Sequence, residues 1–254
     1  GRQNTPPPAE ETQMSKVLDI VPVNNVSTIV GSLHAMLQGA GQSQWSHARL
    51  QGVLGHAFSF EMKEGAGEVW QEANLDWGGF LAMLPDLGYR IRRYEAVQRD
   101  EEGPFKGLKT EAWHAVRASV DRGIPAVAWI PMSGEQKADG LGAWGWGLLV
   151  GYDDSDETYA VRSQYVDGGR KAFTVRYDAI GHNDDAEIFH VLVYDEPAPV
   201  DATGSHIRAL RLAVAFANGT RFDPEDTLYP VDARGHAAYE LWREAIESGV
   251  AVAG

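Results

Sequence analysis

Four side chains of this sequence have the chemistry for acyl transfer or hydrolysis: the hydroxyls of Ser27 and Thr28 and the imidazoles of His56 and His190. A hydroxyl becomes nucleophilic when a neighbouring base takes its proton, and histidine is the usual base. Ser27 and Thr28 stand at the start of a predicted helix, whose dipole alone does not ionise a hydroxyl. The reaction therefore needs one of the two imidazoles within about 3 Å. Cysteine, the stronger nucleophile, does not occur in the chain.

A second set of residues suits ligand binding: Trp144, Gly145, Trp146 and again His56. The two tryptophans are two residues apart, so they share one face of an extended chain. On that face they would either form a platform for a planar or apolar ligand or fill the core. His56 follows a glycine at a predicted helix-to-strand corner, where an imidazole also ties down loop carbonyls.

Two other patterns fail when their context is considered. The glycines between Gly140 and Gly145 match a dinucleotide-binding motif, but that motif needs a strand before it and a helix after it. The acidic run from Asp153 to Glu157 begins like a calcium loop, but it lacks the required glycine and the closing glutamate. We expect a solvated hairpin turn there. The histidines show no metal-ligand spacing, so no metal and no cofactor is expected.

The composition excludes some partners. With 36 acidic and 22 basic residues, the net charge is −14. Such a surface repels phosphate backbones and anionic lipid, so neither nucleic acid nor membrane is an expected partner. No apolar run reaches the roughly 18 residues of a membrane span. A soluble, cytoplasmic location is favoured, although a chain without cysteine survives in either redox environment. The oligomeric state is not indicated.

Hydrophobic periodicity predicts an α+β fold in one domain over residues 17–254, with residues 1–16 as a disordered leader or a remnant of cloning or processing. Residues 63–77 and the polar segment 98–109, with a turn at Gly103-Pro104, are predicted loops. The last four predicted strands have the spacing of an antiparallel meander. The predicted helices are 26–37, 46–54, 78–87, 110–122, 207–217 and 235–246, and the predicted strands are 56–62, 89–94, 124–130, 146–152, 158–163, 171–176 and 188–194.

Five segments resemble one family in their order and spacing: Val26 to Leu37, Leu50 to Phe60, Gly123 to Trp129, Trp146 to Asp154 and Gly235 to Trp242. The chain resembles the C39-like branch of the papain-like cysteine peptidase superfamily, and within it the butirosin-biosynthesis H N-terminal-domain proteins. The resemblance implies a papain-like fold, with N-terminal helices, a mainly antiparallel sheet and C-terminal helices.

The same resemblance shows which catalytic groups are missing. The family uses a cysteine at the start of the first helix, a histidine at the head of the central strand and an orienting Asp or Asn on the next strand. These positions fall here at Val26 to Thr28, near Gly145, and near Ser163 or Gln164. The central strand supplies no base, because no histidine occurs between His114 and His182.

Two functions follow as hypotheses. The first is a non-catalytic pseudo-peptidase that binds a small molecule or a peptide in the vestigial cleft. The second is an acyl transferase or hydrolase with Ser27 or Thr28 as its nucleophile.

Overall fold

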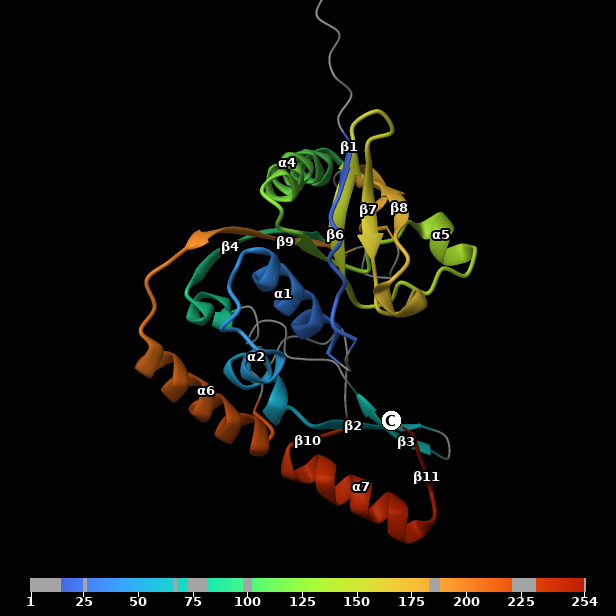
Figure 1. The fold of residues 1–254 in the computed structure, drawn as a ribbon. Coiled ribbons are helices and arrows are strands. Elements are labelled where there is room, and N and C mark those ends of the chain that lie inside the picture. Colours follow the sequence, from blue (N-terminus) through green and yellow to red (C-terminus); the bar gives the residue numbers. More distant parts are fainter. Residues whose placement is uncertain are drawn as a thin grey trace, which may run out of the picture.

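The computed structural model describes residues 15–24, 27–65, 68–72, 82–97, 102–182, 188–220 and 232–253. These residues form an α+β structure, as the sequence predicts (Figure 1). The helices are α1 (Thr28–Gly39), α2 (His47–Val53), α4 (Glu102–Asp121), α5 (Gly134–Ala138), α6 (Ala202–Ala217) and α7 (His236–Ser248), with short 3-10 turns η1 (His56–Phe58), η2 (Leu84–Leu87), η3 (Asp167–Gly169) and η4 (Tyr177–Ala179).

The main sheet has seven strands in the order β4-β9-β5-β6-β7-β8, and β1 pairs with the second half of β6. All of its pairs are antiparallel. Its strands are β1 (Ser15–Val17), β4 (Tyr89–Val97), β5 (Ala126–Trp129), β6 (Trp146–Asp153), β7 (Thr158–Arg162), β8 (Phe173–Arg176) and β9 (Ile188–Pro197).

Helices cover both faces of this sheet, which explains the nearly continuous apolar runs of β5 and β6. Val127, Leu148 and Val150 belong to the core cluster that α1 and α2 complete on one face. Ala128 and Leu149 belong to the cluster that α4 completes on the other. The start of α1 is thereby held against the central strands (Figure 1).

A second sheet was not predicted. It has four strands in the order β10-β2-β3-β11, made by β2 (Glu61–Gly65), β3 (Glu68–Glu72), β10 (Ala233–Arg234) and β11 (Ala251–Ala253). Helix α7 packs on it around Met62, Ala238 and Ala245. Arg234 on β10 forms an ion pair of 2.9 Å with the buried carboxylate of Glu61 on β2.

Two sequence predictions are wrong for local reasons. The predicted strand 56–62 begins instead as the 3-10 turn η1, because Gly55 adopts a φ of +81° and turns the chain sharply before it. The predicted turn at Gly103-Pro104 lies in the first turn of α4, which begins at Glu102. Proline is tolerated there because the N–H groups of the first turn have no partner within the helix.

Other differences concern the limits and order of elements. Strand β9 does not extend the meander β6-β7-β8 but pairs with β4 and β5 at the opposite side of the sheet. The predicted loop 63–77 includes β3, and the predicted helix 78–87 ends in η2, with residues 73–81 outside the described part. The described part begins at Ser15, two residues before the predicted start of the domain, and residues 1–14 of the predicted leader lie outside it.

The acidic run after β6 forms the hairpin turn to β7, as predicted, and Asp153 accepts a hydrogen bond from the Ser155 N–H at 2.8 Å. Within the described ranges, none of the helices has the length and apolar character to cross a bilayer.

Candidate functional site

Thr28 and Gly145 meet where helix α1 and strand β6 begin. Oγ1 of Thr28 accepts a hydrogen bond from the backbone N–H of Trp146 at 2.9 Å. Gly145 has a φ of +72°, and a Cβ atom built at this position would lie 2.7 Å from the same Oγ1. Glycine is therefore needed here both for the backbone conformation and for the close approach of Thr28. Ser27 is the N-cap residue of α1, and its hydroxyl makes no capping hydrogen bond.

Ile130 adds backbone strain to the same place. It is buried and has a φ of +37°, a conformation in which a β-branched residue is an outlier. Its N–H donates to the carbonyl oxygen of Gly145 at 2.7 Å, and its own carbonyl accepts from the Met132 N–H at 2.7 Å. Such a residue costs about 1–3 kcal/mol and persists only where its surroundings enforce it. The backbone is thus strained and tightly fixed where β5 ends and β6 begins.

Trp144 and Trp146 do not share a face, because the positive φ of Gly145 turns the chain between them. Trp146 is 2% exposed and packs against Trp129, with ring centroids 5.5 Å apart. Trp144 is 45% exposed, and Nζ of Lys137 lies 5.2 Å from its ring centroid, within cation–π range. Of the two alternatives, the platform of two tryptophans is therefore wrong, and the core is right for Trp146 alone. Of the two rings, that of Trp144 is the one exposed at the surface.

His190 lies on the inner side of Trp146. It is buried on β9, its ring centroid is 5.0 Å from that of Trp146, and its Nε2 is 3.4 Å from Oε2 of Glu95 on β4. Burial, together with the nearby Arg93 charge, lowers the pKa of His190 to about 4. The imidazole is neutral at pH 7, and its described contacts are with Trp146 and Glu95.

His56 belongs to a cluster of three histidines that sequence reasoning did not find. It starts η1, which packs on α2 and α6. Its pKa is lowered to about 3, first by burial and then by the proximity of His47. The ring of His47 lies 6.3 Å from that of His34 on α1, and the pKa of both is lowered, chiefly by burial. In the described ranges, no group of three or more His, Cys, Asp or Glu side chains is arranged to hold a metal ion.

The structure therefore brings some predicted site residues together and separates others. Thr28, Gly145 and the backbone of Trp146 are in direct contact. His190 is connected to this group through its contact with the ring of Trp146. His56 lies in a different neighbourhood, among α2, α6 and the other histidines.

Near the position that the resemblance assigns to the orienting Asp or Asn, this chain has Ser163 and Gln164. Ser163 is fully buried just after β7, and its hydroxyl accepts from the Tyr165 N–H at 3.4 Å.

Two pockets lined by described residues lie away from the place where β5 ends and β6 begins. One, of about 520 Å³, runs beside the edge strand β4 and is lined by Leu84, Tyr89, Arg90, Arg93 and Pro199, among others. The other, of about 380 Å³, lies between the ends of α6 and α7 and is lined by Ala217, Asp232, Arg234 and His236, among others. Thr28, Gly145 and Trp144 line neither of these two.

Three contributors to the site had no signal in the sequence. Ile130 reads as an ordinary strand residue, Lys137 reaches Trp144 from a short helix, and Glu95 meets His190 only through the register of β4 and β9. A motif search cannot find such residues because their proximity is set by tertiary structure. Comparison with known proteins does not add to this geometry: no protein-family model matches the chain, and no curated protein or solved structure is significantly similar to it.

Proposed function

We propose that this chain is a non-catalytic binding protein with a papain-like fold, which holds a small molecule or a peptide where β5 ends and β6 begins. One contact carries the proposal. The resemblance places the nucleophile among Val26, Ser27 and Thr28 and the base near Gly145, and of these residues Thr28 and Gly145 touch. An imidazole at position 145 would collide with Thr28, whose Oγ1 already accepts the Trp146 N–H. Cysteine is absent from the chain and glycine stands where the base would be, so neither position carries the family's catalytic side chain.

The alternative, an acyl transferase or hydrolase with a hydroxyl nucleophile, has less support. A general base works best when its pKa is near the working pH, and the pKa values of His56 and His190 are about 3 and about 4. Thr28 also faces a backbone donor instead of an imidazole. We therefore favour binding over catalysis.

The chemistry beside Trp144 suggests the class of ligand. An exposed indole offers a flat apolar surface, and Lys137 places a positive charge next to it. A planar ring that carries a carboxylate would stack on the indole and pair with the ammonium group. We propose an aromatic or acyl-peptide acid as the ligand. Its carboxylate would pair with the positive charge of Lys137, although the protein as a whole is acidic.

A thermal-shift screen of aromatic carboxylates and short N-acyl peptides tests the proposal. Each hit is then titrated by calorimetry against the wild type and against Trp144→Ala. Loss of a stacked ring costs up to about 1.5 kcal/mol beyond the lost contact area, so affinity should fall about tenfold or more. Lys137→Ala should weaken the binding of acids and leave the affinity for the matching amides unchanged.

Trp242→Ala is the matched control, since Trp242 is a 40% exposed tryptophan on α7. It should bind every hit as the wild type does. Hits that bind Trp144→Ala with undiminished affinity would contradict the proposal. So would hydrolysis of an activated ester that disappears in Ser27→Ala or Thr28→Ala, because that result would support the enzyme.

A further inference from the structure

Helix α6 has an apolar row on each of two opposite faces. Ala209 and Leu212 are buried in the protein, next to α2 and η1. Ile207, Leu210 and Val214 are 45%, 65% and 62% exposed. Their spacing of three and then four residues aligns them in one row along the helix. A surface helix normally carries polar residues on its outer face, so this row indicates a partner.

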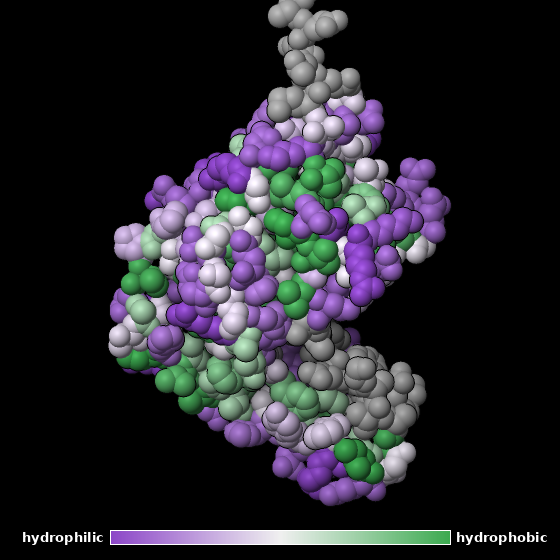
Figure 2. Space-filling view, viewed as in Figure 1, coloured by the Kyte–Doolittle hydropathy of each residue, from purple (hydrophilic) through white to green (hydrophobic). Residues whose placement is uncertain are grey.

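Helix α7 repeats the pattern. Tyr239, Trp242 and Ile246 have the same spacing and are 52%, 40% and 56% exposed. The ring of Tyr239 stacks on Phe60 at 4.2 Å, and the ring of Trp242 meets Phe60 edge-on at 6.4 Å. Figure 2 shows apolar side chains along the lower edge of the molecule, over α6 and over α7.

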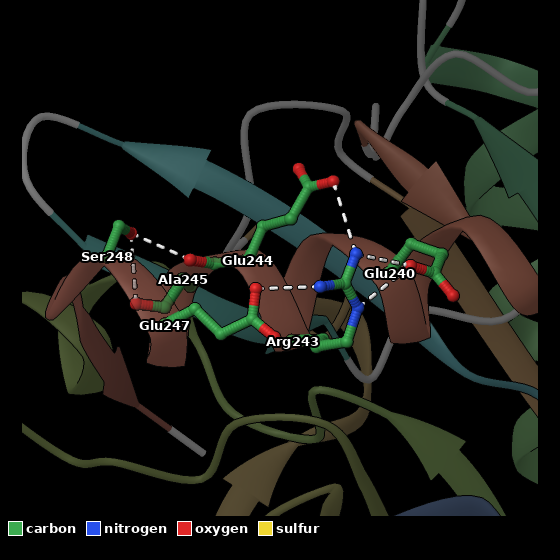
Figure 3. Close-up of polar contacts among 6 residues, drawn as sticks. All are labelled: Glu240, Arg243, Glu244, Ala245, Glu247 and Ser248. Carbon is green, nitrogen blue, oxygen red and sulfur yellow. Dashed lines mark hydrogen bonds and ion pairs between the residues drawn. The ribbon is translucent and has the colours of Figure 1, made fainter.

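The two helices differ in charge. Helix α6 carries Arg208, Arg211 and His206 and no acidic residue. Arg208 is paired with Asp86 of η2, so the positive charge that α6 offers to a partner comes chiefly from Arg211. Helix α7 carries Glu240, Glu244 and Glu247, and Arg243 pairs with all three at 2.8, 3.7 and 2.7 Å (Figure 3). Three carboxylates and one guanidinium leave α7 with a net charge of −2. Two copies of α6 would repel each other, whereas α6 and α7 attract.

We propose that these rows form a homodimer interface in which α6 of each copy packs on α7 of the other. In Figure 1 the two helices follow one another along a single edge and run in the same direction. A two-fold axis between them therefore lays each helix antiparallel on its complement in the second copy. Both contacts are then identical and the assembly is closed.

The size of the surface indicates a weak dimer. Helices of 16 and 13 residues are together about 44 Å long and about 10 Å wide. The area buried is then at the low end of specific interfaces, below about 1,200 Å² in total. We expect association that depends on concentration over the micromolar range, with no dependence on any ligand at Trp144.

Sedimentation velocity of the full chain between about 1 and 300 μM tests the interface. The wild type should shift from monomer to dimer. Leu210→Asp on α6 and Ile246→Asp on α7 should each be monomeric alone, because each removes both α6–α7 contacts of its own dimer.

Tyr165→Asp is the control, because Tyr165 is 53% exposed and lies on neither helix. It should dimerise as the wild type does. Circular dichroism checks folding, and Leu210→Gln and Ile246→Gln replace any aspartate variant that is unfolded. A wild type that stays monomeric at 300 μM overturns the proposal. Normal dimerisation of Ile246→Asp, or species larger than a dimer, would do the same.

Discussion

Gly145→Ala is expected to lower the free energy of unfolding by about 3 kcal/mol. A φ of +72° costs a residue with a Cβ atom about 1–2 kcal/mol. The new methyl group would also lie 2.7 Å from Oγ1 of Thr28, which must move and give up its hydrogen bond from the Trp146 N–H. That bond contributes about another 1 kcal/mol. Urea unfolding followed by tryptophan fluorescence measures the change.

A double-mutant cycle with Thr28→Ala separates the two causes. Removal of Oγ1 and Cγ2 relieves the closest contacts, so the double variant should be less destabilised than the sum of the single ones by about 1 kcal/mol. Gly140→Ala is the matched control, because Gly140 has a φ of +86° with nothing within 4 Å of the added Cβ. If Gly145→Ala costs no more than Gly140→Ala, the close approach of Thr28 is not limiting.

Acidification from pH 7.5 to pH 5 is expected to remove about 4 kcal/mol of stability through His56 and His190 alone. In the folded protein their pKa values are about 3 and about 4, so both stay neutral at pH 5. In the unfolded chain they titrate near 6.5 and bind protons at pH 5. Their stabilising effect is therefore complete above about pH 7 and is lost as pH falls through 6.5 towards the folded pKa values. Each histidine accounts for about 2 kcal/mol of the stability lost at pH 5. The size of this loss depends mainly on the pKa of the imidazole in the unfolded chain.

Denaturant melts at the two pH values of the wild type, His56→Gln and His190→Gln test this prediction. Each variant should show a pH-induced loss about 2 kcal/mol smaller than that of the wild type, whatever its stability at pH 7.5. His114→Gln, which replaces an exposed imidazole, should keep the loss of the wild type. An unchanged loss in both buried-histidine variants would mean that these imidazoles are protonated as readily in the folded protein as in the unfolded chain.

Sequence patterns predicted the elements of the main sheet well because most of these strands are apolar runs bounded by turn residues. The outcome was poorer wherever one backbone angle decides the result. Trp144 and Trp146 have the spacing of neighbours on one face, but the conformation of Gly145 sends one outward and the other into the core. Likewise, Gly55 replaces the start of a predicted strand with η1.

Long-range pairing escaped prediction for a different reason. The position of β9 between β4 and β5 depends on contacts across many residues, and the spacing of strands along the chain does not encode it. The cluster of His34, His47 and His56 likewise joins three separate elements. The contact of Thr28 with Gly145 was easier to predict, because the resemblance already placed both residues at a shared site.

The place of β9 also has a consequence for how the protein is made. Strands β4 and β5 leave the ribosome well before β9, yet β9 must lie between them. Until residues 188–197 have been synthesised, the sheet is divided and the facing edges of both strands have no partner. Unpaired strand edges are sites of aggregation, and sheets built from distant segments form slowly. The nascent chain is therefore most vulnerable late in synthesis, and the arrival of β9 ends that period.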